Sequence, residues 1–121
     1  MTIILKNTKE IGTYYEKQCS LFLIKKGYTI KKHNYRSSYG EIDIIAEKND
    51  TIYFVEVKSS KHDYKKLLYK LTKFKQKKII KTALDYIVNN HYNDTQINFI
   101  YMIVSKNKIR YYENAINIDL T

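Results

Sequence analysis

The chain has 121 residues, of which 44% are hydrophobic and 28% are charged, an ordinary balance for one globular domain with its own core. Its 22 basic and 12 acidic residues give a formal net charge of +10, which favours a polyanionic partner, with nucleic acid ahead of an anionic membrane surface. Its apolar runs are far shorter than the ~20 residues that span a bilayer, and its one cysteine excludes an intramolecular disulfide. These features favour a single cytoplasmic domain over residues 1–121.

The first expected element is a helix that begins at Asn7 or Thr8 and ends at Lys26, before Gly27. Glu16 lies at the edge of its apolar stripe, either as a boundary residue or as an acid that reaches a charged site in the sheet. The stripe has near-helical spacing and consists of Ile11, Tyr15, Cys19, Phe22 and Leu23. Residues 1–6 fit a strand fragment or a loose arm, residues 28–35 a strand, and residues 36–40 a connection.

A β-hairpin at residues 39–58 is the centre of the predicted fold. A two-residue turn at residues 49–50 pairs positions whose numbers sum to 99, which sets Asp43 opposite Glu56. Paired side chains in an antiparallel ladder lie on one face, and their backbones are ~4.5–5.5 Å apart. Two carboxylates at this distance repel each other unless a cation lies between them, one of them keeps a proton, or both reach water.

The same register sets Glu41 opposite Lys58. Alternation along the two strands predicts one apolar face and one face that becomes charged toward the end of the hairpin. The apolar face carries Ile42, Ile44, Val55 and Val57, and the other carries Ile45, Phe54, Glu56 and Lys58. The plain alternative is a partly exposed hairpin with an ordinary surface salt bridge.

The second half of the chain predicts a polar loop at residues 59–65 and a long helix from Lys66 or Leu67 to Asn90. Strands follow at residues 96–105 and 108–112, and the last nine residues are a short strand or a tail. Because the helix joins two strands, those strands should be parallel. The predicted fold class is α/β, with a mixed central sheet flanked by helices in the order αβββαβ and a terminal hairpin.

Ten lysines fall between Lys58 and Lys81, against one acid, Asp63. A run of like charge is commonly a solvated helix face, and that interpretation stays open. The imbalance nevertheless leaves few opposite charges for pairing along the helix. It predicts a strong positive field beside the charged end of the hairpin.

The spacing of Asp43, twelve intervening residues and then Glu56-x-Lys58 resembles the PD-(D/E)xK, or restriction-endonuclease-like, nuclease superfamily. A narrower resemblance, over about residues 12–104, is to the YraN family of predicted endonucleases, which is related to the archaeal Holliday-junction resolvases. The blocks that carry it are Gly12 with Glu16, Gly27-Tyr28, Asn34-Tyr35-Arg36, Gly40-Glu41-Ile42-Asp43-Ile44-Ile45, Phe54-Val55-Glu56-Val57-Lys58, Lys75-Gln76-Lys77-Lys78-Ile79, Ala83 and Tyr86-Ile87. The resemblance implies a restriction-endonuclease-like αβββαβ core.

The resemblance also implies roles for individual residues. Asp43 and Glu56 are the expected catalytic and metal-binding acids, Lys58 is the catalytic lysine, and Glu16 is an additional acid. With the Val57 carbonyl, these groups would hold Mg²⁺, or Mn²⁺ in its place, for phosphodiester hydrolysis. The residues expected to contact nucleic acid are Arg36, Lys61, Lys65, Lys66, Lys75, Gln76, Lys77 and Lys78.

Asn98-Phe99-Ile100 departs from the family, which tends to have an arginine and an aspartate around this phenylalanine. This departure motivates an alternative, a catalytically silent nucleic-acid-binding module of the same fold. A third class, an adaptor that binds proteins or membrane surfaces through its basic helix, lacks a wide apolar face with aromatic anchors. The leading hypothesis is a Mg²⁺-dependent, structure-selective DNA endonuclease acting on branched or single-stranded DNA, with monomer and homodimer both open.

Overall fold

The computed structural model describes residues 7–61 and 63–117. The expectations for residues 1–6 and 118–121 lie outside this range, and residues 113–117 form turns and bends. The elements are α1 (Thr8–Lys25), β1 (Thr29–Arg36), β2 (Glu41–Lys48), β3 (Thr51–Ser60), α2 (Lys65–Leu68), α3 (Lys73–Asn89), β4 (Gln96–Ser105) and β5 (Lys108–Tyr112).

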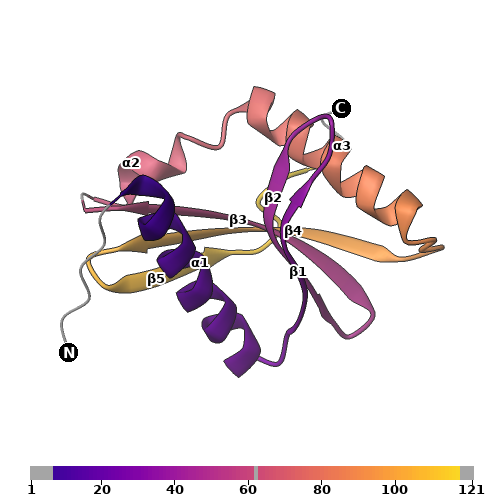
Figure 1. The fold of residues 1–121 in the computed structure, drawn as a ribbon, viewed down its shortest axis with the longest axis horizontal. Coiled ribbons are helices and arrows are strands. Elements are labelled where there is room, and N and C mark those ends of the chain that lie inside the picture. Colours follow the sequence, from indigo (N-terminus) through magenta and orange to yellow (C-terminus); the bar gives the residue numbers. More distant parts are fainter. Residues whose placement is uncertain (1–6, 62, 118–121) are drawn as a thin grey trace.

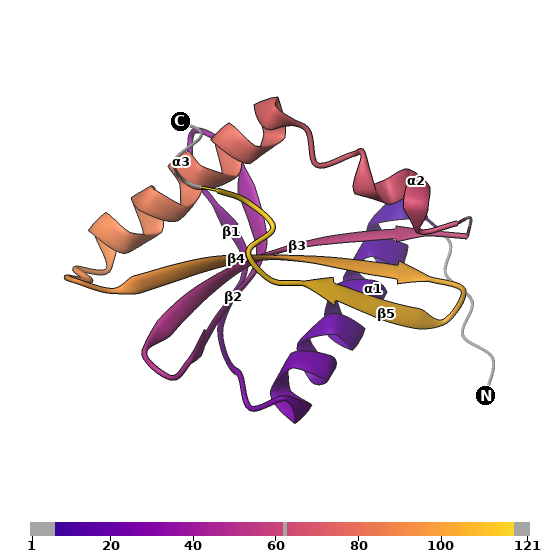
Figure 2. The same ribbon diagram turned by 180° about the vertical axis from the view of Figure 1, so that it is seen from behind.

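The five strands form one sheet in the order β1-β2-β3-β4-β5. The β3–β4 pair is parallel and the other neighbours are antiparallel, which confirms the predicted mixed sheet. Helix α1 covers one face, and α2 and α3 cover the other (Figures 1 and 2). The fold is therefore a three-layer α/β arrangement.

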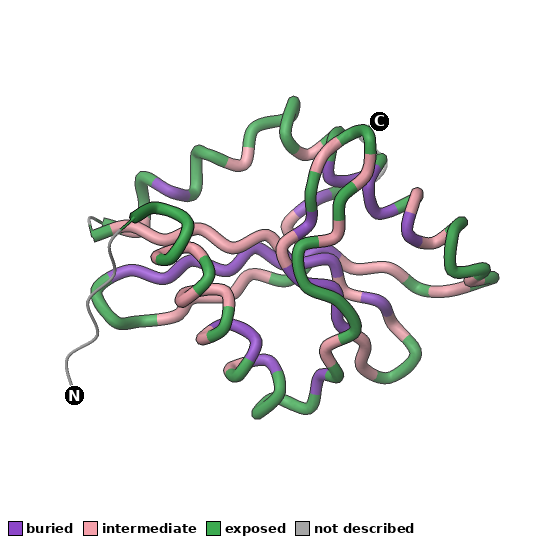
Figure 3. Tube along the Cα trace, in the orientation of Figure 1, coloured by how far each residue is buried: buried purple, intermediate pink, exposed green. Residues whose placement is uncertain are grey.

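Strand β4 shows how one sheet serves two cores. Its even-numbered residues Ile100, Met102 and Val104 pack with α1, and its odd-numbered residues pack with α2 and α3, as the two-residue period of a strand requires. Both faces of β4 are covered, so seven successive residues are buried. Figure 3 shows the buried residues concentrated along the central strands and the inward sides of the helices.

Helix α1 begins and ends as the sequence predicts. The Asn7 side chain accepts a hydrogen bond from the Glu10 backbone N–H at 2.9 Å, which caps the first turn. Gly27 has a φ of +95°, the left-handed conformation that follows many helices. Cys19 and Leu23 are fully buried against the sheet, and Cys19 is a free thiol.

The prediction of one long helix after the hairpin is wrong in its first part. The chain forms the short helix α2, and then α3 begins after Thr72, whose hydroxyl accepts the Lys75 backbone N–H at 3.2 Å. The buried Tyr101 hydroxyl donates to the Leu67 carbonyl at 2.6 Å and fixes α2 over β4. Leu67 is buried and Leu68 is exposed. Strand β3 also continues to Ser60, into the expected loop.

The predicted hairpin register is confirmed in the half nearest the turn. The pairs run from Lys48–Thr51 to Ile44–Val55, and each sums to 99. Asn49 and Asp50 have φ values of +50° and +63°, typical of a two-residue hairpin turn. The ladder stops at Ile44–Val55, so the expected pairings of Asp43 with Glu56 and of Glu41 with Lys58 are not part of it.

The predicted apolar face is wrong at one residue. Ile44 packs on the α1 side with Val55, but Ile42 packs on the α3 side with Phe54. Strict alternation would keep both isoleucines on one side. On the neighbouring strand β1, Asn34 has a φ of +52°, and this local twist accompanies the turn of Ile42 toward α3.

Candidate functional site

The candidate site lies where β2 and β3 separate. Beyond Ile44–Val55, β3 continues beside β4 while β2 remains paired with β1, and the two ribbons diverge in Figure 1. In the opening, Asp43 Oδ2 accepts a hydrogen bond from the Val57 backbone N–H at 2.7 Å. The carboxylate thus takes the place of a strand carbonyl.

Two further acids from different elements meet Asp43. Burial, and then the hydrogen bond and charge of Asp43, raise the pKa of Glu56 on β3 to about 9 against the opposing charges of Lys58 and Lys75. Burial, and then the charge and hydrogen bond of Asp43, raise the pKa of Glu16 on α1 to about 7. The cluster therefore retains protons that a cation could replace.

Asn34 and Arg36 border the acids on the α1 side. With its amide oriented to satisfy both neighbours, Asn34 Nδ2 donates to Glu16 Oε2 at 3.3 Å and to Glu41 Oε1 at 3.1 Å. Arg36 Nε lies 3.7 Å from Glu41 Oε2. A cavity of about 270 Å³ opens beside them and is lined by Lys9, Gly12, Thr13, Glu16, Asn34, Arg36 and Glu41. The site therefore has room next to its acids.

The donor chemistry of the cluster fits a hard cation. Asp43 and Glu56 carry carboxylate oxygens, and Val57, whose N–H bonds Asp43, also has a backbone carbonyl oxygen; these are the ligand types that Mg²⁺ prefers. Within residues 7–61 and 63–117, however, no three His, Cys, Asp or Glu side chains stand in a metal-binding arrangement. Asp43 Oδ2 accepts the Val57 N–H, which leaves Oδ1 as the oxygen available to a cation.

The lysines predicted for the site fall into two groups. Lys58 and Lys75 both act on the charge of Glu56, so the structure brings them together with the acids. Lys78 lies one turn further along α3, next to Gly40. Lys61 follows the end of β3, Lys65 and Lys66 lie on α2, and Lys77 lies on α3; all four are exposed. Among the described residues, no ion pair joins them to the acids. Gln76 Nε2 donates to the Leu71 carbonyl at 2.9 Å.

Two residues near the acids were not assigned roles from the sequence. Asn34 bridges Glu16 and Glu41. The sequence feature that points to it is an asparagine inside a predicted strand, because asparagine tolerates a positive φ. Tyr101 pairs with Glu56 in the parallel register. Burial, and then the Glu56 charge, raises the pKa of Tyr101 to about 12. The register of β3 and β4 would have revealed Tyr101, but the sequence alone does not fix that register.

Asn98, which departs from the family pattern, forms hydrogen bonds with Asn114. Its Nδ2 donates to Asn114 Oδ1 at 2.8 Å, and its Oδ1 accepts the Asn114 backbone N–H at 3.0 Å. These bonds hold the segment after β5 against β4. Asn98 lies three residues from Tyr101, about 10 Å along the strand, so its amide lies away from the acids.

None of the helices in the part of the chain that the structure describes has the length and hydropathy required to cross a membrane.

Residues 15–118 match the family model of the uncharacterised protein family UPF0102. A UPF0102 protein of Fusobacterium nucleatum is 39% identical over 111 residues, covering 91% of this chain and 93% of the relative. One from Clostridioides difficile is 41% identical over 112 residues, covering 90% and 98%. A solved structure, "Crystal structure of SSO0001", has a TM-score of 0.46 at 14% identity and covers 93% of this chain. The match spans about half of that structure (52%).

Proposed function

The chain belongs to the uncharacterised protein family UPF0102, the YraN family whose motifs it resembles, and from this premise we propose that it is a Mg²⁺-dependent, structure-selective DNA endonuclease. The observation that carries the proposal is the meeting of Asp43 with Glu16 and Glu56 where β2 leaves β3. The proposal includes a restriction-endonuclease-like αβββαβ core. Family membership brings no activity with it, so the chemistry depends on these side chains.

Each residue has a task in phosphodiester hydrolysis. Asp43, Glu56 and the Val57 carbonyl would hold the ion, and Glu16 would add a further oxygen ligand. When bound, Mg²⁺ would polarise the phosphate and lower the pKa of a water. Lys58 acts on the charge of Glu56 and would bind a phosphate oxygen, stabilising the negative charge that develops during hydrolysis.

The substrate class follows from the positive charge beside the acids. Lys75 and Lys78 stand in the first turns of α3 beside the acids, where they would contact the DNA backbone. Backbone contacts position DNA without reading its sequence, so selectivity would come from the shape of branched or single-stranded DNA. Resolution of a four-way junction would also need a homodimer, which stays a prediction.

The test is cleavage of labelled DNA (a four-way junction, a flap, a single strand and a plain duplex) with Mg²⁺ or Mn²⁺. Glu56→Gln and Lys58→Ala should each lower cleavage by about 10²-fold or more, because each removes charge that acts on the reacting phosphate. Binding of the same DNA should change little. Asp94→Asn is the control, because Asp94 is an exposed turn residue. Cutting that survives both substitutions would contradict the proposal.

The alternative, a catalytically silent nucleic-acid-binding module of the same fold, also has observations in its favour. No three acids in the described residues stand in metal-binding geometry, and Asp43 is engaged by the Val57 N–H. On this alternative, wild type binds the DNA panel tightly but cuts none of it with either metal. The cleavage experiment therefore separates the two functions.

A further inference from the structure

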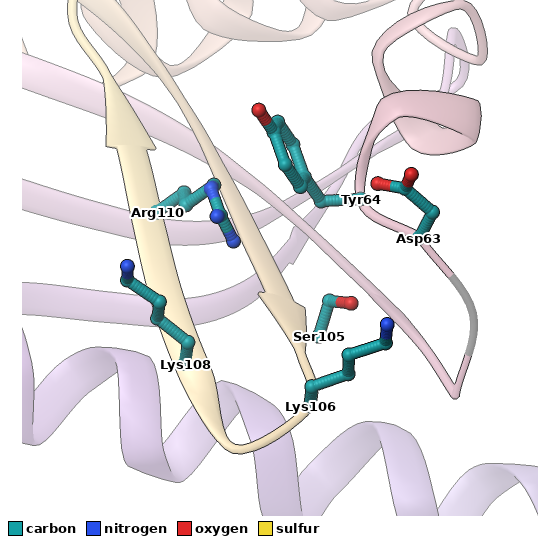
Figure 4. Close-up of a pocket in the computed structure, with 6 residues that line it drawn as sticks. All are labelled: Asp63, Tyr64, Ser105, Lys106, Lys108 and Arg110. Carbon is teal, nitrogen blue, oxygen red and sulfur yellow. The ribbon is translucent and has the colours of Figure 1, made fainter.

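A second charged cavity lies beside the β4–β5 hairpin. Its volume is about 220 Å³. Figure 4 shows its side chains between the β4–β5 hairpin and the segment that leads into α2. They are Asp63, Tyr64, Ser105, Lys106, Lys108 and Arg110. The pocket joins two segments more than forty residues apart in sequence and uses none of the residues assigned to catalysis.

Arg110 is held in this pocket by an aromatic ring. Its guanidinium carbon lies 3.6 Å from the centroid of the Tyr64 ring, close enough for a cation–π contact. A guanidinium stacked on its flat face keeps the N–H groups along its edge available for hydrogen bonding. This is the geometry that suits two-point recognition of a phosphate.

The positive charge of the pocket is only partly compensated. Lys106, Lys108 and Arg110 face one carboxylate, Asp63, whose Oδ1 accepts the Lys65 backbone N–H at 3.1 Å. The Arg36–Glu41 ion pair lies at another place in the fold and does not involve the residues that line this pocket. An anion is therefore the ligand whose charge fits this pocket.

The strand register connects the pocket to the active site. Lys58 on β3 pairs with Ile103 on β4, and Ile103 pairs with Arg110 on β5, so these side chains stand in one row on one face. Two strand spacings place Arg110 about 10 Å from Lys58 at the backbone. One nucleic-acid strand can therefore reach both side chains.

We propose that this pocket binds a backbone phosphate of the nucleic acid, on the same strand as the phosphate at Lys58. Arg110 holds the phosphate edge-on, and Lys106 and Lys108 add charge at the rim. The assignment rests on the proposed nucleic-acid substrate but not on cleavage. Leu67 of α2 covers Ile103, the middle residue of this row, so a nucleic-acid strand that reaches both Lys58 and Arg110 passes around α2. The shared row on one sheet face favours a backbone phosphate over a free phosphate ion.

The experiment measures DNA binding without cleavage. Fluorescein-labelled junction and single strand are titrated in EDTA across a salt series, and anisotropy gives the affinity. The variant carries Lys108→Gln and Arg110→Gln. The matched control carries Lys31→Gln and Lys32→Gln, which remove the same charge from exposed positions of β1 at the opposite sheet edge. Lys108→Gln alone, at an exposed position, leaves the stacked arginine in place and serves if the double variant fails to fold.

The expected result is a loss of about 1 in the slope of log K against log salt for each phosphate contact removed. Lys108→Gln alone should reduce the slope by part of that amount, and the β1 control should stay near wild type. Equal slopes for the pocket variant and the β1 control would overturn the proposal, as would a failure of wild type to bind DNA.

Inorganic phosphate provides the second arm. If phosphate shifts the Arg110 side-chain NMR signal while the DNA slopes of variant and control agree, the pocket takes a free ion and the proposal is overturned. Cleavage of the DNA panel with Mg²⁺ is recorded in parallel. A reduced slope in the pocket variant with no cutting by wild type supports phosphate binding in the pocket and contradicts the proposed nuclease activity. Cutting by wild type with unchanged slopes supports the nuclease activity and contradicts phosphate binding in the pocket.

Discussion

The two halves of the β2–β3 hairpin differ in both chemistry and regularity. Near the turn, residues 44–55 form a ladder in register, with buried apolar side chains on both faces. Beyond Ile44 and Val55 the strands part, and the side chains in the gap are the acids Asp43 and Glu56. The turn half buries apolar side chains that stabilise the fold, whereas the open half brings like charges together, which lowers stability. This cost is the one expected if the open half holds the proposed site.

The first way to test this contrast is to remove a large side chain from the regular half. Phe54 is 1% exposed and contacts the rings of Tyr86 and Phe99. Phe54→Ala should lower the free energy of unfolding by about 3–5 kcal/mol, because it leaves a cavity in the α3-side core. Urea denaturation followed by circular dichroism measures this loss. A loss below about 1 kcal/mol would mean that the turn half does not hold the sheet.

A substitution in the open half should have the opposite sign. Burial raises the pKa of Glu56 to about 9, above the ~4.3 of an unfolded glutamate, so the folded state binds more protons between these values. Stability of metal-free wild type should then fall as pH rises from 5 to 9. Glu56→Gln should remove most of this fall and raise the free energy of unfolding at pH 9 by about 1–3 kcal/mol.

This pH series is run by urea denaturation in EDTA at pH 5, 7 and 9. Asp94→Asn again provides a control that removes an exposed carboxylate. Glu16, whose pKa burial raises to about 7, contributes to the fall between pH 5 and 7 in both wild type and Glu56→Gln. If Glu56→Gln is less stable than wild type at pH 9, the carboxylate stabilises the fold and the contrast between the halves is lost.

The smallest effect is expected at Gly12, on the α1 side of the open half. Glycine inside a helix costs roughly 0.5–1 kcal/mol relative to alanine, and an added Cβ at Gly12 would meet nothing within 4 Å. Gly12→Ala should therefore stabilise the protein by that amount, measured by urea denaturation.

Gly12→Leu should place a side chain in the cavity beside Glu16 and lower DNA cleavage without loss of stability. Full activity in Gly12→Leu would show that substrate does not use this cavity.

The regular half could be predicted from the sequence because its causes are local. Turn residues at Asn49 and Asp50 and the alternation of apolar residues fix the register. The open half depends on neighbours that a single pattern does not contain. Strand β1 draws β2 away from β3, and Asn34 accompanies the turn of Ile42 to the other face. Asp43, Glu56 and Glu16 meet in the structure, but the expected ladder pairing of Asp43 with Glu56 is wrong.

The helices show the same limit. Asn7 and Gly27 mark the ends of α1 through local capping. The long second helix was wrong because the contact between Tyr101 and the Leu67 carbonyl comes from a distant strand. The local sequence signal for the start of α3 is its N-cap residue, Thr72. The sequence does not predict a role for Arg110 for a related reason: its contact with Tyr64 joins residues that are distant in sequence and meet only in the folded chain.

Alkylation of the buried Cys19 thiol can measure how often α1 separates from the sheet. The side chain has no solvent exposure, and burial raises its pKa to about 12, so thiol reagents meet neither an accessible nor an ionised sulfur while the helix is seated. Alkylation then proceeds only as often as α1 lifts from the sheet. Because Glu16 lies on the same helix, the alkylation rate counts the openings that also take one acid out of the cluster.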